Sequence, residues 1–322
     1  MARPLRAGGL ALALVSSFAF AMSGPLAKPL LDAGWSAGAA ALLRIGGAAL
    51  VLLIPTVLLI RNSGVAGLAG AWRYLLGYAA LAVAGTQIGF FSAIQTLPVG
   101  LALLIEYTGP LLVVLWLWWR HGQRPTRWVV VGGALAMAGL VLILDPSSSG
   151  GLDPVGVLWA VFAAVCLAGY FVLSAQVQDD LPPLVVVGTG MVAGWLLLAV
   201  AAVLGLLPVV TTTAPVAIGG QVVPWWWPAI ALVLVATVFA YLTGIAAVRR
   251  LGARLASFVS LLELVMATAL SALLLAQVPG PRQLLGGVVI LIGLVLVRIG
   301  EPDPEPEPGF PTIRDTPSTL SA

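Results

Sequence analysis

The stretch LALLIEYTGPLLVVLWLWW, residues 101–119, is a long apolar run that contains one carboxylate, Glu106, and one proline, Pro110. Its length suits a membrane span, because a helix needs about 20 apolar residues to cross a bilayer. Proline lacks the N–H that would bond to the carbonyl four residues earlier, which here belongs to Glu106 itself. The stretch therefore predicts a bent, polar place inside a span, and such backbone is tolerated where it faces a cavity within the protein.

The composition of the whole chain supports a membrane protein. Of 322 residues, 61% are hydrophobic and 8% are charged, whereas ordinary globular chains have about 45–50% and 25%. The mean hydropathy is +1.09. A single cysteine, Cys166, excludes an intramolecular disulfide. These values predict an all-α integral membrane protein whose first partner is the lipid bilayer.

Ten segments are apolar and long enough to span, with Gly, Pro and charged residues between them. The first begins with arginines and resembles a signal peptide, but nine further spans favour an uncleaved helix. The predicted spans are 7–27, 37–60, 74–96, 98–119, 127–144, 154–175, 183–207, 225–247, 253–276 and 281–298.

Orientation follows from the placement of Lys and Arg, which concentrate in cytoplasmic loops. With the N-terminus inside, only Lys28 and Arg282 lie outside, and Arg44 lies within a span. Twelve arginines then lie inside: Arg3, Arg6, Arg61, Arg73, Arg120, Arg124, Arg127, Arg249, Arg250, Arg254, Arg298 and Arg314. We therefore expect both termini in the cytoplasm.

The two halves of the chain are related by a constant shift of 154 residues. Under this shift Gly132, Gly133 and Gly139 align with Gly286, Gly287 and Gly293, and Pro125 aligns with Pro279. Five spans per half is an odd number, so the second half must be inverted in the membrane. Inverted repeats are typical of secondary transporters that expose a midplane site alternately to each side. The paired glycines favour close packing of the fifth helix of each half.

Several stretches resemble the drug/metabolite transporter superfamily, EamA type, and within it the bacterial threonine and homoserine exporters. They are SGPLAKPLLDAGWSAGAAALLRIGGAAL (23–50), EYTGPLLVVLWLWWRHGQRP (106–125), DPVGVLWAVFAAVCLAGYFVLSAQ (153–176) and YLTGIAAVRRLGARLASFVSLLEL (241–264). The resemblance covers residues 8–298. It implies ten transmembrane helices as two inverted five-helix repeats, 1–145 and 146–298. The sequence departs from the family's pattern at Glu263-Leu264, where the family commonly has Glu-Pro, and at Ala276-Gln277, where the family commonly has Gly-Glu.

Three charged residues lie inside predicted spans: Arg44, Glu106 and Glu263. Each costs about 2.5–3.5 kcal/mol at the bilayer centre, so we expect a partner or a water-filled cavity. Arg44 and Glu106 lie at similar depth, which allows an ion pair or a shared substrate, and snorkelling is the alternative for Arg44. Loss of water disfavours the charged carboxylate, so Glu263 and Glu106 are the proton-coupling candidates, with Glu263 favoured. A structural role is the alternative, in which Ser260 or Thr268 bonds Glu263.

Uncharged polar residues at mid-depth complete the candidate site. The substrate-binding candidates are Arg44, Gln87, Glu106, Tyr107, Tyr170 and Tyr241. Interhelical hydrogen bonds explain such side chains as often as ligands do. Ser17 is a further candidate. Tryptophans 225–227 and 116, 118 and 119 open or close spans, as interfacial aromatic belts do.

The sequence thus predicts a secondary transporter that exports small metabolites, amino acids or related compounds, by alternating access, with protons as a second partner. A passive facilitator is the alternative, and a membrane-embedded enzyme is a remote one. One histidine, one cysteine and two membrane acids predict no enzyme, no metal and no cofactor. The arginines follow topology, so no nucleic-acid partner is expected. Residues 299–322 are acidic and proline-rich and predict a disordered tail.

Overall fold

The computed structural model describes residues 2–63, 66–97, 99–144, 153–175, 181–275 and 280–300. Nine helical segments of these residues are long and apolar enough to cross a membrane, and a shorter apolar helix accompanies them. Together they make the ten predicted transmembrane helices. The part of residues 299–322 that begins at Glu301 lies outside the described residues, while Ile299 and Gly300 belong to the last helix.

The first half of the chain forms five crossings, three of which are interrupted. Its elements are α1 (Ala2–Ala21) and α2 (Ser23–Asp32), α3 (Ala37–Ser63), α4 (Ala66–Gly77) with the π-helix η1 (Tyr78–Gly85) and α5 (Thr86–Ala93), α6 (Val99–Glu106) with α7 (Gly109–His121), and α8 (Arg127–Leu144).

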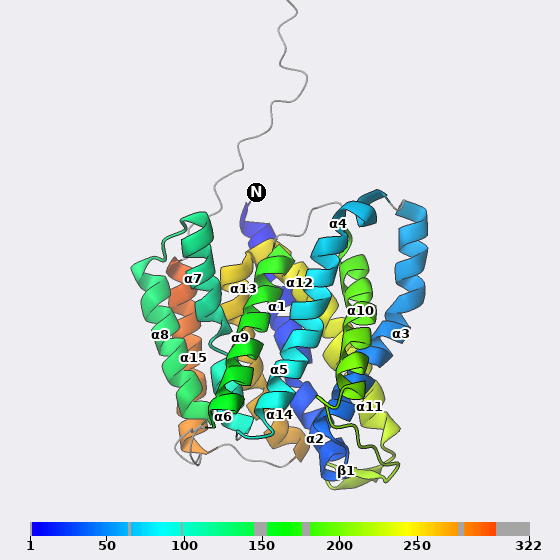
Figure 1. The fold of residues 1–322 in the computed structure, drawn as a ribbon. Coiled ribbons are helices and arrows are strands. Elements are labelled where there is room, and N and C mark those ends of the chain that lie inside the picture. The colour runs from blue at the N-terminus through cyan, green and yellow to red at the C-terminus, as the bar shows by residue number, and fades with distance from the viewer. Residues whose placement is uncertain are drawn as a thin grey trace, which may run out of the picture.

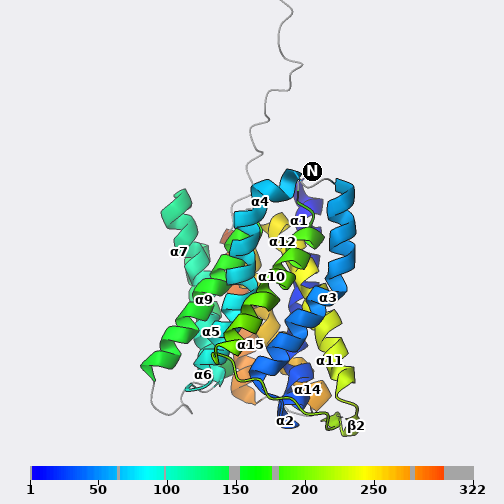
Figure 2. The same ribbon diagram turned by 45° about the vertical axis from the view of Figure 1, so that its right-hand side comes forward.

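The second half repeats this order. Its elements are α9 (Pro154–Ala175), α10 (Pro183–Val203), α11 (Trp226–Val233) with the π-helix η3 (Leu234–Phe239) and α12 (Ala240–Leu251), α13 (Ala253–Ser260) with α14 (Leu262–Leu275), and α15 (Pro281–Gly300). Figures 1 and 2 show the helices as one bundle, with the start of α1 and the end of α15 on the same side. We call that side the N-terminal face and the other side the opposite face.

The helices α8 and α15 lie side by side (Figure 1) and pack more extensively than any other pair. Gly132 lies against the backbone of Gly293, and Gly139 lies against that of Gly286. A Cβ at any of these four positions would come within 2.5–2.6 Å of the facing carbonyl oxygen. Because the shift of 154 exchanges the two contacts, the pair has the antiparallel arrangement that an inverted repeat requires. The predicted close packing of these glycines is confirmed.

The helix interruptions follow the same internal symmetry. Adding 154 to η1 gives residues 232–239, which overlap η3 at Leu234–Phe239. The break between α6 and α7 at residues 107–108 corresponds to the break between α13 and α14 at Leu261. A π-helix widens the backbone and often marks a functional site. The third and fourth helices of each half are therefore irregular at matching depths.

A short hairpin covers the opposite face. Strands β1 (Val216–Ile218) and β2 (Gln221–Val223) pair antiparallel, and Gly219 and Gly220 have the positive φ angles of a two-residue turn. The sequence analysis treated this segment as a loop. Trp35 anchors it, because the indole N–H donates a hydrogen bond to the Thr212 carbonyl at 2.8 Å and the ring packs on Trp225.

Candidate functional site

The bend predicted in the opening stretch lies at Tyr107 and Thr108. Glu106 is the last residue of α6, and α7 resumes at Gly109 with Pro110 in its first turn. The Thr108 hydroxyl donates to the Ile105 carbonyl at 2.6 Å, which satisfies one backbone group that the break exposes. The irregular backbone therefore presents Glu106 and Tyr107 at a helix end inside the bundle.

The matching break in the second half presents Glu263. This residue is the second of α14, the helix that begins directly after Leu261. The start of a helix carries positive partial charge, which favours a carboxylate there. The Tyr107 hydroxyl donates a hydrogen bond to the Glu263 carboxyl group, and Glu106 lies within electrostatic reach of it. The two interrupted helices thus meet through three polar side chains, which were all predicted candidates.

Arg44 reaches this place from α3. Its Nε donates to Thr237 Oγ1 at 3.3 Å, and a terminal nitrogen donates to the Ala236 carbonyl at 3.4 Å, both in η3. The arginine is thus held inside the protein by the π-helix, although the sequence allowed it to snorkel. Its charge acts on Glu263 and on Tyr241.

The expected ion pair between Arg44 and Glu106 is not formed. Arg44 makes no salt bridge with either acid, and the charged residue that acts on Glu106 is Glu263. The proposed structural partners of Glu263 are also wrong. Ser260 bonds to the Ser257 carbonyl and Thr268 to the Leu264 carbonyl, each within its own helix.

Tyr241 and Tyr170 extend the site on its N-terminal side. The Tyr241 hydroxyl donates to the Ala82 carbonyl in η1 at 3.3 Å. The Tyr241 ring lies 5.0 Å from Phe20 and 6.0 Å from Tyr170, between centroids. Interhelical contacts therefore account for both side chains, as the alternative interpretation held. Ser17 bonds to the Val259 carbonyl at 3.4 Å, so it too is a structural contact.

Gln87 differs from these residues. It lies in α5, one position after Thr86, and is half-buried. Among the described residues its amide has no hydrogen-bond partner. An amide at this depth without a protein partner fits a cavity that holds water or ligand, since a membrane interior offers no other partner.

Glu106 and Glu263 are both partly buried. Both carboxyl groups are surrounded by protein, yet Glu106 and Glu263 each keep part of their surface accessible. We name Arg44, Glu106, Tyr107, Tyr241 and Glu263 the central site.

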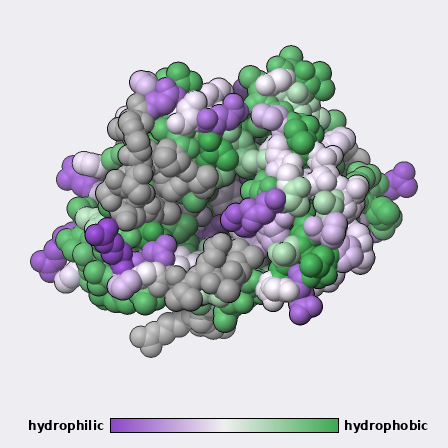
Figure 3. Space-filling view, turned by 90° about the horizontal axis from the view of Figure 1, so that it is seen from below, coloured by the Kyte–Doolittle hydropathy of each residue, from purple (hydrophilic) through white to green (hydrophobic). Residues whose placement is uncertain are grey.

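The helix contacts around the two breaks differ between the two faces. Towards the N-terminal face, α7 packs against α13, and residues 253–259 of α13 are all buried. Towards the opposite face, α6 and α14 have no comparable contact, and α14 is partly exposed beyond Leu264. Figure 3 shows hydrophilic atoms scattered on that face and reaching its middle. The two halves therefore pack more closely on the N-terminal side of these breaks than on the opposite side.

The sequence analysis missed one contact between the two halves on the N-terminal side. Arg254, at the start of α13, is buried and donates to the carbonyl and the side-chain oxygen of Gln123, at 3.2 and 3.4 Å. Gln123 lies in the connection between α7 and α8, in the other half of the chain. The sequence analysis had used the positive charge of Arg254 only to assign its loop to the cytoplasmic side.

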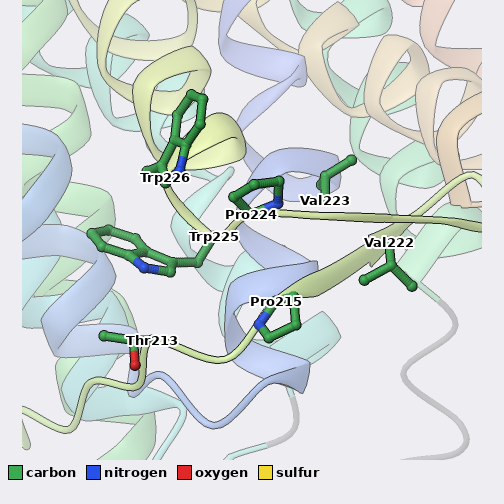
Figure 4. A pocket seen from close by; sticks show the side chains of 7 residues that line it. All are labelled: Thr213, Pro215, Val222, Val223, Pro224, Trp225 and Trp226. Atoms are coloured by element: carbon green, nitrogen blue, oxygen red, sulfur yellow. The ribbon is translucent and has the colours of Figure 1, made fainter.

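Two surface pockets lie away from the central site. One, of about 420 Å³, is on the opposite face between the hairpin and the start of α11 (Figure 4). Trp225 and Trp226 form one side of it, and Val222 and Val223 form another. The second lies beside Ile143 and Gln283. The first pocket is lined mainly by apolar side chains, whereas Arg282 and Gln283 line part of the second.

Within the described residues, no group of three or more His, Cys, Asp and Glu is placed to hold a metal ion. The polar groups of the central site instead offer one cation, two carboxyl groups and a tyrosine hydroxyl. Acids beside broken helices in inverted repeats are typical of membrane transporters.

The comparisons with known proteins identify the family. The chain belongs to the EamA-like transporter family, whose model matches it twice, over residues 7–145 and 154–299. It is therefore a multi-pass membrane transporter protein.

Individual relatives agree with this family. The chain is 29% identical over 132 residues to the threonine/homoserine exporter RhtA of Salmonella typhimurium, which covers 41% of this chain and 43% of that exporter. It is 34% identical over 105 residues to RhtA of Escherichia coli, covering 32% and 33%. The chain thus spans less than half the length of these exporters.

Longer matches have less specific names. The uncharacterized transporter YwfM of Bacillus subtilis is 26% identical over 258 residues, covering 79% of this chain and 81% of the relative. One crystal structure superposes with a TM-score of 0.73 at 21% identity, covering 91% of this chain and 98% of that one. This likeness supports the fold.

Proposed function

We propose that the protein exports small zwitterionic metabolites, amino acids or related compounds, by alternating access in the bacterial inner membrane. The observation that carries the proposal is the meeting of Tyr107, Glu263 and Arg44 at two symmetry-related helix breaks. A zwitterion brings an ammonium and a carboxylate, and the central site offers two acids and one arginine for them. The matched exporters, whose names specify threonine and homoserine, support the amino-acid class.

The N-terminal face is proposed to be cytoplasmic. Helices α3, α7, α12 and α15 carry arginines in their last turns, at positions 61, 120, 249, 250 and 298, and Arg124 lies in the connection that follows α7. The positive-inside rule then places both ends of the described chain in the cytoplasm. With this orientation the two halves pack more closely on the cytoplasmic side, as they would in the releasing state of an exporter.

The two acids have different surroundings, which assigns them different roles. Loss of water disfavours the charged form of both acids, but Glu263 has Arg44, a donating tyrosine hydroxyl and a helix N-terminus near it, and all three favour its negative charge. Glu106 ends α6, where the helix dipole opposes a negative charge, and its charged neighbour is another acid. We therefore propose Glu106 as the proton carrier and Glu263 as the anion that holds the substrate ammonium. The sequence analysis had favoured the reverse, because it expected Arg44 beside Glu106.

A passive facilitator is the remaining alternative, because inverted repeats do not require coupling. Reconstitution into proteoliposomes, with a panel of radiolabelled amino acids, distinguishes the two. A proton antiporter concentrates its substrate against a gradient when a pH difference is imposed and stops when an ionophore removes it. Equilibration that ignores the pH difference would show a facilitator, and no flux of any panel member would refute amino-acid transport.

A further inference from the structure

A second polar cluster lies between the central site and the N-terminal face. Tyr74 and Tyr78 are one turn apart along α4 and η1, and Tyr170 and Ser174 are one turn apart along α9, so each pair shares a helix face. The Tyr78 ring lies 6.5 Å from Tyr74 and 6.2 Å from Tyr170, and Tyr170 lies 6.0 Å from Tyr241. The rings therefore form a continuous series that leads away from the central site.

Two hydroxyl groups in this cluster lack the partners that buried hydroxyls normally have. Tyr78 and Ser174 are completely buried, and neither Tyr78 Oη nor Ser174 Oγ has a hydrogen-bond partner among the described residues. Tyr74 is the contrast, because its hydroxyl donates to the Leu173 carbonyl at 3.1 Å. Unsatisfied buried hydroxyls destabilise a conformation, so their retention points to another state or a ligand that satisfies them.

A positive charge lies at the N-terminal end of the cluster. Arg249, in the last turn of α12, acts electrostatically on both Tyr74 and Tyr78. A guanidinium together with two hydroxyl donors is the set of groups that binds a carboxylate. The central site has the opposite bias, because it holds two acids to one arginine.

We propose that Tyr78, Ser174 and Arg249 form a second binding site, which takes the carboxylate of the solute when the protein is open towards the N-terminal face. The assignment rests on the proposed function, because it takes the solute to be an amino acid. In the described conformation the site is closed. The helix α10 covers the Tyr78 ring so closely that a Cβ at Gly190 would lie 2.7 Å from Tyr78 Cδ1. Movement of α10 away from η1 would expose the cluster, and the solute would then pass along the tyrosines to the central site.

The test is the double substitution Tyr78→Phe and Ser174→Ala, which removes both hydroxyls and keeps the packing. Exchange of radiolabelled L-threonine is measured in inside-out and right-side-out vesicles, as a function of its concentration on the accessible side. Loss of hydrogen bonds to a charged group predicts a half-saturating concentration roughly tenfold higher at the N-terminal face. At the opposite face the value should stay within about twofold, because the central site is intact. The control is Thr189→Ala, whose hydroxyl bonds to the Val185 carbonyl of its own helix.

An unchanged half-saturating concentration at both faces, or an equal rise at both, would overturn the assignment. If the wild-type protein transports L-threonine and the double variant behaves like it, only this assignment fails. If the wild type transports no amino acid, the proposed function fails and the assignment fails with it.

If the double variant does not fold, a labelling measurement on a different variant tests the same proposal. Ser174→Cys in a Cys166→Ser background should react with a membrane-permeant maleimide during transport, and L-threonine should slow that reaction. Reaction that L-threonine does not slow, or no reaction during active exchange, would contradict a solute site at Ser174.

Discussion

The packing of α8 on α15 makes a prediction whose size follows from the geometry. At Gly286 a Cβ would lie 2.6 Å from the Gly139 carbonyl oxygen and 2.8 Å from Ile143 Cγ1. The neighbouring Gly287 is a matched control on the same helix, because its Cβ would meet Val265 Cγ1 at the ordinary distance of 3.4 Å. Gly286→Ala therefore forces two helix backbones apart, whereas Gly287→Ala does not.

Overpacking of this kind costs about 1–3 kcal/mol, and the upper part of the range applies where the obstacle is backbone. At about 2–4 °C per kcal/mol, the melting temperature of Gly286→Ala should fall by roughly 3–10 °C. Gly287→Ala should be neutral or slightly stabilised, because alanine is the better helix former. The melting temperature of Gly132→Ala, at the symmetry-related position, should fall as much as that of Gly286→Ala, because the new Cβ would lie 2.5 Å from the Gly293 carbonyl oxygen.

The buried Cys166 provides the assay. A thiol-reactive fluorophore labels it only when the purified protein unfolds, and the temperature of labelling gives the melting point in detergent. Equal melting temperatures for Gly286→Ala and Gly287→Ala would refute the close glycine contact. A large difference between Gly132→Ala and Gly286→Ala would refute the symmetry of the two halves.

Three further predictions address closure, topology and pH. In a Cys166→Ser background, cysteines at Gln123 and Arg254 should be joined by a cleavable bifunctional thiol reagent that spans the lost side chains, and this link should stop transport reversibly, because the two side chains join the two halves on the N-terminal face; transport that continues after complete cross-linking would exclude a closing role. Single cysteines at exposed Thr211 and Gln123 should be labelled from opposite sides of the membrane, Thr211 from outside whole cells; labelling of both from one side would contradict the topology. A hydrogen bond from Thr96 and another from the Gly156 N–H lower the pKa of Asp153 at the start of α9. A lowered folded-state pKa stabilises the protein above the unfolded pKa of about 4 and loses that effect as the pH falls further, so the melting difference between wild type and Asp153→Ala should shrink below about pH 4; a difference that grows on acidification would contradict it.

Hydropathy and glycine positions were sufficient to predict the fold. Each of the ten spans was predicted from its length and its apolar composition. The inversion of the second half follows from the odd number of spans, five, in each half. The paired glycines were predicted to pack, and Gly132, Gly139, Gly286 and Gly293 do so. These features depend on the lengths and order of segments, which a sequence displays directly.

The partners inside the membrane were predicted less well. Depth along a helix can be counted from sequence, but rotation about the helix axis and the approach of a neighbouring helix cannot. Arg44 was therefore placed at the level of Glu106, while its guanidinium bonds to η3 and acts on Glu263. The π-helices have no sequence signal, although they supply the carbonyl that holds Arg44.

The second polar cluster could have been predicted from the spacing of its residues along the sequence. Tyr74 and Tyr78, and likewise Tyr170 and Ser174, are spaced four residues apart, so each pair lies on one helix face. Only Tyr170 of these four was a predicted candidate. Spacing of polar residues along each span is therefore informative even where every residue is uncharged.

The central claim is that two acids at matching helix breaks divide proton coupling and substrate binding between them. It is tested most directly by comparing Glu106→Gln with Glu263→Gln in proteoliposomes, through pH-driven flux and counterflow of the best panel substrate. Glu106→Gln mimics the protonated acid, so we predict intact counterflow but no response to the pH difference. Glu263→Gln should lose affinity in both assays, because its charge binds the ammonium. Full pH-driven accumulation by Glu106→Gln would contradict the account.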